Sequence, residues 1–470
     1  MHPSTLAKRV YIFLFLIIIA FYLFGIGSLP LLGPDEPRYA QVAREMFLRG
    51  DPVTPTLGGH TWFEKPALLY WMIAASFKVF GVSEFSARLG PAVCGLLTIA
   101  AVWVVGRKID AGFWSLIVTA TCLGLIVFSR AASFDVVITM TTTWALAFFL
   151  LHELGNTDRK TMLLTGFYAF IGLSLIAKGL VGIVVPFGVV GLYYLLRRRW
   201  PQRSVWLSVV WGVPLALAVS ALWYGPVIAR HGWSFIDEFF LQHHFARYVS
   251  NKYHHPQPFY FFPAIILMLA LPWTPYLVYA LAKARRWTWR GDDKSSIARV
   301  FALAWLILPI VFFSFSGSKL PGYVLPALPA AALLVADVLR QRKPVVPIVI
   351  AAGTVVLVIV ALIFFAKPIA NRESVRDLLL LADQRGYAGA PVLARNSDDR
   401  SAQFYAHDRV VYGDDEDVLT YDRVSKAAAR KLGDKIVVLI PAEYVENFRN
   451  TPGIEVIGDN GSTAILGWKP

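Results

Sequence analysis

The sequence has little charge and almost no cysteine. Only 16% of its 470 residues are charged, whereas 56% are hydrophobic and 15 are tryptophan. So few charges cannot cover the apolar surface of a soluble protein of this size, which excludes that class. The two cysteines, Cys94 and Cys122, both lie within long apolar runs. They are expected to be small buried hydrophobic side chains and not the partners of a disulfide.

Long apolar runs recur along most of the chain, each close to the ~20 residues that cross ~30 Å of hydrocarbon. The first run is too long, and too closely followed by others, for a cleaved signal peptide. The pattern therefore predicts a polytopic α-helical membrane protein. About eleven spans are expected, at residues 10–29, 85–106, 111–130, 135–154, 161–177, 180–196, 206–228, 260–282, 299–317, 321–339 and 344–366.

The net charge of +14 suggests a nucleic-acid partner at first, but the distribution of the basic residues argues against it. Basic clusters occupy alternate loops, as the positive-inside rule requires of cytoplasmic loops. The N-terminus is therefore expected in the cytoplasm, and residues 30–84, 131–134, 231–259, 318–320 and the tail after 367 on the opposite side. The clusters are Lys8/Arg9, Arg107/Lys108, Arg159/Lys160, Arg197–Arg198–Arg199, Lys283/Arg285/Arg286/Arg290 and Arg340/Arg342/Lys343.

Two parts of the chain differ in composition. Residues 1–366 form the membrane domain, whereas residues 367–470 contain short alternating runs separated by Gly, Asp and Asn turns, which is typical of a small α/β domain. Within the outer segment 30–84, "PRYAQVAREMFLRG" has one apolar helical face, with Pro37 suited to its first turn and Gly50 to its end. This stretch and "PALLYWMIAASFKVFG" are expected to be helices lying along the membrane surface.

Charged and polar residues gather in the segments assigned to the outer face. Charged groups at membrane depth are costly and need partners, so several clusters on one face favour a functional site. The candidates are Asp35, Glu36 and Arg38; Glu64 and Lys65; Arg130 and Asp135; His243, His244, Arg247, His254 and His255; and Lys319 and Tyr323.

Each cluster also has a structural interpretation. Asp35 could serve simply as the N-cap of a helix. Glu64 and Lys65 could form an interfacial ion pair, and Lys319 could extend its ammonium group to the interface. Arg130 and Asp135 could form an ion pair between adjacent spans, and the histidines could be solvated. Their joint placement on one side shifts the balance toward function. The cytoplasmic face shows no Gly-rich nucleotide loop.

Several motifs occur in a recognisable order: "GPDEPRYAQVAREM", "FEKPALLYWM", "SRAASFD", "HHFARY", "HHPQPFYFF" and "SKLPGYVLPALP". They resemble the aminoarabinose (lipid A) transferase branch of the protein mannosyltransferase-like family, which are GT-C fold glycosyltransferases. The match runs through about the first 340 residues. The resemblance implies a GT-C type membrane protein of the bacterial inner membrane, with a small C-terminal α/β periplasmic domain.

The resemblance further implies a donor sugar carried on undecaprenyl phosphate and an acceptor such as lipid A, another glycan or a protein. Breaking the sugar–phosphate bond leaves a lipid phosphate, so cations are needed where that charge develops. Lys65, Arg247 and Lys319 are the candidates, with Tyr323 donating a hydrogen bond. Attack opposite the departing phosphate would make this hexosyl or pentosyl transfer inverting.

The acids have separate expected roles. Asp35 matches the family residue that positions or deprotonates the acceptor, and Asp135 is the second catalytic acid, orienting the sugar or a cation of the site. An acceptor phosphate would need no base, in which case Asp35 would hold the sugar, through an amino group for example. The remaining substrate-binding candidates are Glu36, Arg38 and Arg130.

A divalent metal, zinc or magnesium, is a further hypothesis. Glu64 with His244 and His255 could form a His₂Glu site, although these ligands come from distant loops and no local spacing supports it. Three other functions compete with the transferase: a flippase for lipid-linked glycans, an O-antigen-ligase-like enzyme and an inactive assembly factor. A flippase would place charges near the bilayer midplane, whereas here they gather at one surface.

Overall fold

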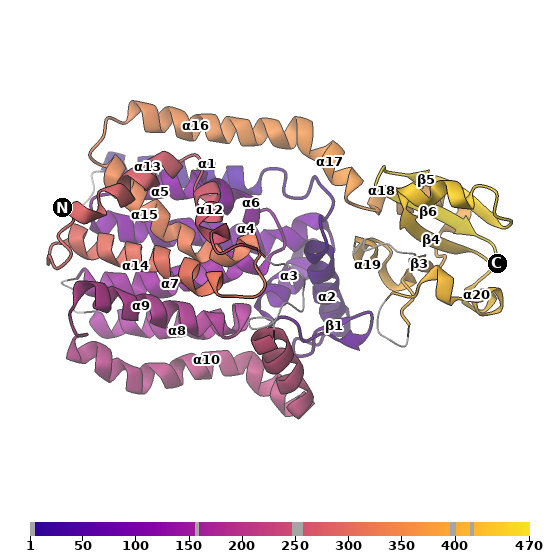
Figure 1. Ribbon diagram of the computed structural model, residues 1–470, viewed down its shortest axis with the longest axis horizontal. Coiled ribbons are helices and arrows are strands. Elements are labelled where there is room, and N and C mark those ends of the chain that lie inside the picture. The colour runs from indigo at the N-terminus through magenta and orange to yellow at the C-terminus, as the bar shows by residue number, and fades with distance from the viewer. Residues whose placement is uncertain (1–4, 156–158, 247–256, 395–400, 414–417) are drawn as a thin grey trace. The chain divides into compact units, whose positions relative to one another are not determined.

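The computed structural model describes residues 5–155, 159–246, 257–394, 401–413 and 418–470, without the side chains of residues 5–8 and 243–246. The chain forms two compact units, which are described separately (Figure 1). The helical unit comprises Met1–Phe24, Phe63–Leu69 and Leu89–Val358. The mixed unit comprises Gly25–Trp62, Tyr70–Arg88 and Ile359–Pro470, so it joins the first outer segment to the C-terminal residues. The linear division at residue 366 stays a prediction.

The helical unit is a bundle of apolar helices. Its elements are α1 (Thr5–Leu23), most of α4 (Glu84–Lys108), α5 (Gly112–Thr121), α6 (Leu123–Phe128), α7 (Phe134–Glu153), α8 (Lys160–Lys178), α9 (Val181–Arg197), α10 (Arg203–Ile236), η1 (Asp237–Ala246), α12 (Phe261–Leu269), α13 (Thr274–Ala282), η2 (Ala284–Arg286), α14 (Lys294–Ser314), η3 (Pro321–Ala327), α15 (Leu328–Leu339) and α16 (Val345–Val360).

Seven helices in the described part of the chain are long and apolar enough to cross a membrane. They match seven of the expected spans, which confirms a multi-span membrane protein. Helix α7 and the η3–α15 segment are 78% and 89% buried along their apolar stretches, so they form the centre of the bundle. The stretch Val345–Arg372 is only 6% buried, so its apolar side chains are left to face lipid.

Two of the expected spans are broken into pairs of helices. Residues 111–130 form α5 and α6, which meet at the extended backbone of Cys122, and residues 260–282 form α12 and α13, which are separated around Pro272. The two breaks satisfy each other. The Leu123 N–H donates to the Leu271 carbonyl at 2.8 Å, and the Trp273 indole N–H donates to the Thr121 hydroxyl at 3.0 Å. Backbone groups freed by a broken helix must find such partners where water is absent.

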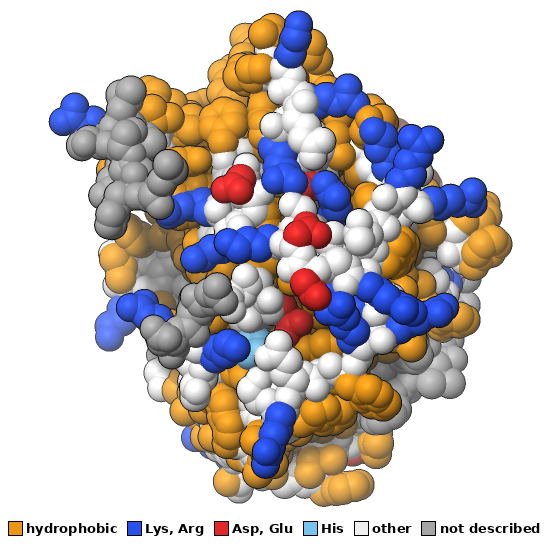
Figure 2. All heavy atoms as spheres, turned by 90° about the vertical axis from the view of Figure 1, so that its left-hand side faces the viewer, with side chains coloured by type: hydrophobic (Ala, Val, Ile, Leu, Met, Phe, Trp, Pro, Cys, Tyr) orange, Lys and Arg blue, Asp and Glu red, His pale blue; other side chains and the backbone are white. Residues whose placement is uncertain are grey.

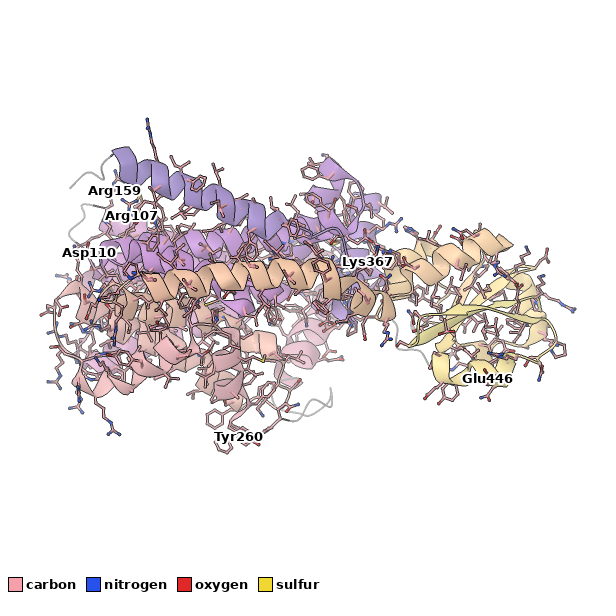
Figure 3. All side chains as sticks on the ribbon, turned by 90° about the horizontal axis from the view of Figure 1, so that it is seen from above. Arg107, Asp110, Arg159, Tyr260, Lys367 and Glu446 are labelled. Carbon is pink, nitrogen blue, oxygen red and sulfur yellow. The ribbon has the colours of Figure 1, made fainter. Side chains whose placement is uncertain are left out.

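The basic loops lie together at one end of the helical unit. Arg107, Asp110 and Arg159 are found at this end in Figure 3, and Figure 2 shows Lys and Arg side chains spread over it. The C-terminal ends of α4, α7, α9, α13 and α15 all lie here, as the alternation of charge predicts. Which side of the membrane this end faces stays a prediction from the charge rule.

The mixed unit begins with the outer segment. Its elements there are α2 (Asp35–Arg49), β1 (Thr56–Leu57), β2 (His60–Thr61), most of α3 (Leu68–Phe80) and the first residues of α4. Helix α2 has Pro37 in its first turn and ends at Gly50, whose left-handed φ of 63° stops the helix. The sequence prediction of this helix is therefore confirmed.

The C-terminal part of the mixed unit is a small α/β domain, as predicted. It contains η4 (Ala361–Phe365), α17 (Ala366–Arg372), α18 (Arg376–Ala382), η5 (Asp383–Tyr387), β3 (Val392–Ala394), α19 (Ser401–Tyr405), η6 (His407–Arg409), η7 (Tyr421–Arg423), α20 (Lys426–Leu432), β4 (Ile436–Pro441), η8 (Ala442–Phe448), β5 (Ile454–Asp459) and β6 (Thr463–Trp468). The strand order is β3-β4-β6-β5, with β3 parallel to β4 and the other pairs antiparallel. Alternate residues of β4 enter two separate cores, so both faces of the sheet are covered.

A buried ion pair holds the start of the outer segment. The Arg88 guanidinium on α4 donates to both carboxylate oxygens of Glu36, at 2.6 and 2.7 Å. Its other three N–H groups donate to the backbone carbonyls of Ile26, Leu29 and Pro30. Arg88 and Glu36 are 3% and 5% exposed. All five donors of Arg88 are thus used to fold the chain between α1 and α2.

The C-terminal domain holds the same segment. The Tyr405 hydroxyl accepts from the Leu31 N–H at 2.8 Å and donates to the Glu84 carboxylate at 3.1 Å. Burial raises the pKa of Tyr405 above its usual value, so the hydroxyl keeps its proton for Glu84. Arg376 on α18 also contacts Glu84, at 3.1 Å. These contacts connect the residues just before Asp35 to the C-terminal part of the chain.

We expect Arg88→Met to lower the stability of the purified protein by about 3–5 kcal/mol, because it leaves the Glu36 carboxylate buried without its cation. Thermal unfolding in detergent would show a reduced melting temperature. Arg385→Met is the matched control, since the Arg385 side chain is 57% exposed and lies 3.8 Å from Glu455. The control should change stability by less than about 1 kcal/mol. Equal melting temperatures for the two variants would contradict the role given to Arg88.

Candidate active site

Three polar residues from separate helices meet at one end of the helical unit. Asp135 lies in the first turn of α7, where its N–H donates to the capping Ser133 hydroxyl at 3.1 Å. Helices α7 and α8 run antiparallel, so the last residue of α8, Lys178, reaches the start of α7. The Lys178 ammonium group donates to the Asp135 carboxylate. This acid–base pair lies at the opposite end of α7 and α8 from the basic loops.

Tyr323 completes this cluster from η3. The Lys178 nitrogen lies 4.7 Å from the centre of the Tyr323 ring, a cation–π distance. The ring itself packs against Phe313 at 5.2 Å between centroids. Gly322 passes so close to the Asp135 carboxylate that a β-carbon at this position would collide with it. Only glycine allows η3 to close over the start of α7 without moving the acid.

Lys319 precedes η3 in the same connection. Its ammonium group donates to the Gln257 carbonyl at 2.9 Å and is exposed. Lys319 and Tyr323 therefore share one short segment between α14 and α15, as the motif "SKLPGYVLP" predicts. The interpretation of Lys319 as a group extended to the interface is compatible with this exposure.

Arg130 does not pair with Asp135. Its guanidinium donates to the Phe21 carbonyl at 2.5 Å and lies over the rings of Phe21 and Tyr22, at 4.8 and 5.8 Å from their centres. The hypothesis of an ion pair between Arg130 and Asp135 is therefore wrong, because Asp135 is neutralised by Lys178. Two buried nitrogens of Arg130 have no hydrogen-bond partner among the described residues.

Glu64 and Lys65 contact each other directly. The Lys65 ammonium group donates to the Glu64 carboxylate at 2.8 Å, and Glu64 is 8% exposed. The preceding Phe63 anchors this pair in the helical unit. Its N–H donates to the Glu238 carboxylate at 3.3 Å, and its ring contacts Phe235 at 5.1 Å between centroids. The ion pair that the structural interpretation requires is present, and it leaves the proposed role of Lys65 open.

In the mixed unit, the outer acids have different surroundings. Pro34 occupies the capping position of α2 and Asp35 is the first helical residue, so Asp35 is not the helix cap. Asp35 pairs with Arg38, whose guanidinium also lies 5.3 Å from the Trp62 ring centre. Glu36 is buried against Arg88 and fastens the chain. We therefore keep Asp35 and Arg38 as site candidates and assign Glu36 a structural role.

Three of the predicted site residues, His244, Arg247 and His255, fall in a segment that the structure does not fully describe. Arg247 and His255 lie outside the described residues, as does the side chain of His244. In the part of the chain that the structure describes, no group of three or more His, Cys, Asp or Glu residues could hold a metal ion. The site of Glu64, His244 and His255 thus stays a prediction.

Sequence reasoning missed two residues of these clusters. Lys178 stands alone in the apolar run "LIAKGLVG", and Arg88 stands alone in "FSARLGPAV". An isolated charge in such a run was the available signal, because it must find a partner. The identity of that partner depends on the packing of helices distant in sequence.

Comparison with known proteins agrees with this architecture. Residues 64–224 match the family described as dolichyl-phosphate-mannose-protein mannosyltransferase. The chain is 31% identical over 343 residues to the undecaprenyl phosphate-alpha-4-amino-4-deoxy-L-arabinose arabinosyl transferase of Aeromonas salmonicida, covering 70% of this chain and 60% of that protein. The transferase of the same name from Pseudomonas aeruginosa strain LESB58 is 33% identical over 330 residues, covering 68% and 58%.

The fold is that of two solved glycosyltransferases. The crystal structure of ArnT from Cupriavidus metallidurans bound to undecaprenyl phosphate has a TM-score of 0.80 at 22% identity, covering 98% of both chains. The Archaeoglobus fulgidus oligosaccharyltransferase has a TM-score of 0.52 at 13% identity, covering 94% of this chain and 70% of that one.

The fold is therefore that of a polytopic GT-C type membrane protein with a small C-terminal α/β domain. The comparisons also confirm the predicted resemblance to the protein mannosyltransferase-like family and its aminoarabinose transferase branch. The chain spans 60% and 58% of the length of the two sequence relatives. Its activity, substrates and partners are therefore proposals.

We expect Gly322→Ala to displace the Asp135 carboxylate and to reduce the sugar transfer proposed below by about 10²-fold, since shifts near 1 Å in a site can cost this much. The test is an in vitro transfer assay with purified protein. Gly191→Ala is the matched control, because a β-carbon at Gly191 of α9 meets open space. Equal activity of both variants, at equal melting temperatures, would show that the position of Asp135 does not matter.

Proposed function

We propose that this protein is a glycosyltransferase that moves a sugar from undecaprenyl phosphate to lipid A on the periplasmic face of the inner membrane. The sugar favoured by the names of the relatives is 4-amino-4-deoxy-L-arabinose. The observation that carries the proposal is the cluster of Asp135, Lys178 and Tyr323. These groups lie at one end of an apolar bundle, where a lipid-linked phosphate would meet water.

The proposed reaction is a displacement at the anomeric carbon of the sugar. An acceptor oxygen forms a bond to this carbon while the bond to the phosphate oxygen breaks, and undecaprenyl phosphate leaves with the electron pair. Attack from the opposite side inverts the configuration. The negative charge that develops on the departing phosphate requires fixed cations, which are more effective here than in water. Lys65, Arg247 and Lys319 are the proposed cations.

Lys178 pairs with the Asp135 carboxylate in an apolar setting. A carboxylate held between an ammonium group and the first turn of a helix has a fixed orientation, and it can accept hydrogen bonds from sugar hydroxyls. Tyr323, fixed by its ring contacts, is the proposed hydrogen-bond donor to the phosphate. Two buried guanidinium nitrogens of Arg130 have no hydrogen-bond partner among the described residues, so they are available to bind an anionic group of the substrate.

Asp35 keeps the role that the resemblance implies. With a lipid A phosphate as acceptor, the attacking oxygen is already ionised, so Asp35 would bind the amino group of the sugar through charge. With a hydroxyl acceptor, it would remove the proton. A bound zinc or magnesium ion is not required by either form of the reaction.

Lipid A from a deletion strain should lack the species that carries one additional sugar, and the wild-type gene should restore it. Asp35→Asn should not restore it, because the substitution removes the charge and keeps the shape. The measurement is mass spectrometry of extracted lipid A, with Asp51→Asn as a control on the same segment. Unchanged lipid A in the deletion strain, with sugar-linked carrier lipid trapped in the inner leaflet, would instead indicate a flippase.

Replacing a cation of the donor site should weaken binding of undecaprenyl phosphate. Lys65→Ala, Arg247→Ala and Lys319→Ala should each cost about 1.5–3 kcal/mol, or roughly 10- to 150-fold in affinity. The measurement is microscale thermophoresis of the purified variants. Lys294→Ala, at the opposite end of the helical unit, should bind as the wild type does. Wild-type affinity for all three site variants would remove these residues from the phosphate site.

A further inference from the structure

A concave surface lies at the basic end of the helical unit, at the far end of the bundle from Asp135. It is a cavity of about 430 Å³ between the end of α13, the following loop, α14 and the end of α15. We call it the basic cavity and define it by Tyr279, Lys283, Arg286, Arg299, Asp337 and Arg342. Figure 2 views this end, where basic side chains surround a few acidic ones.

The charges of the basic cavity are not balanced. Asp337, 7% exposed, pairs with Arg299 at 2.6 Å and with the adjacent Arg340 at 3.0 Å. The Asp337 carboxylate is therefore neutralised by arginines that fasten α14 to α15. Within the described part of the chain, Lys283, Arg286 and Arg342 form no ion pair. Four cations against one acid leave the cavity wall with a large excess of positive charge.

Two of these cations are held together by one aromatic ring. The Lys283 nitrogen lies 4.4 Å from the centre of the Tyr279 ring, and the Arg342 guanidinium carbon lies 4.9 Å from it. The two residues come from different loops, and their like charges repel each other at this separation. An anion bound between them would remove this repulsion, so the arrangement is suited to a phosphate group.

The surroundings favour a phosphate that is carried on a lipid. The floor of the basic cavity includes apolar side chains of α15, and the cavity lies at the ends of membrane-length helices. Next to it along the chain, Val278 on α13 and Val345 at the start of α16 are 50% and 67% exposed. Acyl chains can pack on such apolar helix surfaces while the head group stays at the basic loops. Basic pockets at this depth between membrane helices typically bind anionic head groups.

We propose that the basic cavity binds the phosphate head group of an anionic phospholipid from the leaflet that contacts the basic loops. Lys283, Arg286 and Arg342 bind the phosphate oxygens, and Tyr279 holds two of these cations in place. The bound lipid would connect α13 to the loop after α15. This site is independent of the proposed sugar transfer, because it shares no residue with the clusters at the other end.

The test uses delipidated full-length protein in detergent and dioctanoyl phosphatidylglycerol as the probe. Lys283→Gln/Arg342→Gln should bind the lipid at least about tenfold more weakly than the wild type, since two charge-assisted contacts are lost. Arg285→Gln/Arg290→Gln is the matched control, because it makes the same change in charge on the loop that carries Lys283 but outside the cavity wall. Native mass spectrometry and thermophoresis would count bound lipid and measure its affinity.

Each result decides the proposal. An equal loss in both double variants would show only diffuse attraction to a basic surface, and no loss in either would show no site at the cavity. Inorganic phosphate or glycerol 3-phosphate binding as tightly as the lipid would assign the cavity to a free anion instead. Should Lys283→Gln/Arg342→Gln unfold, Arg286→Gln replaces it, because the exposed Arg286 side chain forms no hydrogen bond or ion pair with the described residues. Unchanged lipid affinity of that variant would equally reject the proposal.

Discussion

A charge placed in an apolar helical protein must have a partner, and the structure depends on this requirement. Lys178 neutralises Asp135, Arg88 neutralises Glu36, and Asp337 neutralises Arg299, in each case between two different helices. Each pair therefore fixes the register between two helices, which non-directional hydrophobic contacts alone would not specify. Removing one partner of a buried pair leaves an unpaired charge, and this destabilises the fold more than replacing both partners by apolar residues. The pairs give an apolar bundle a specific register.

The same requirement applies to the backbone. The interruptions at Cys122 and Pro272 would expose unsatisfied N–H and carbonyl groups within the bundle, yet they lie against each other and exchange a hydrogen bond. In the outer segment, Arg88 performs this function by binding three carbonyls of a non-helical stretch. Irregular backbone is thus found where a specific donor or neighbouring break satisfies it, and such rigid irregular segments are suited to carrying site residues.

The two ends of the helical unit have opposite chemistry. At one end, Asp135, Lys178 and Tyr323 form a compact and nearly neutral cluster, in keeping with precise positioning of a polar substrate. At the other end, the cations of the basic loops exceed the acids, which attracts phosphate-bearing partners in general. The proposed sugar transfer uses the acid of the first end, whereas the acid of the second end, Asp337, pairs with arginines of α14 and α15.

Much of this protein was determined by local sequence. Hydropathy located seven of the eleven expected spans, charge alternation ordered the loops, and the motifs around Asp35, Glu64 and Tyr323 indicated the family. The helix from Asp35 to Arg49 followed from its own pattern and from Gly50. These features are readable because each depends on neighbouring residues. The partners of Asp135 and Glu36, the meeting of two broken helices and the union of the outer segment with the C-terminal domain were decided only by tertiary structure. They depend on which distant elements pack together, and a buried charge or free carbonyl accepts whichever partner that packing supplies.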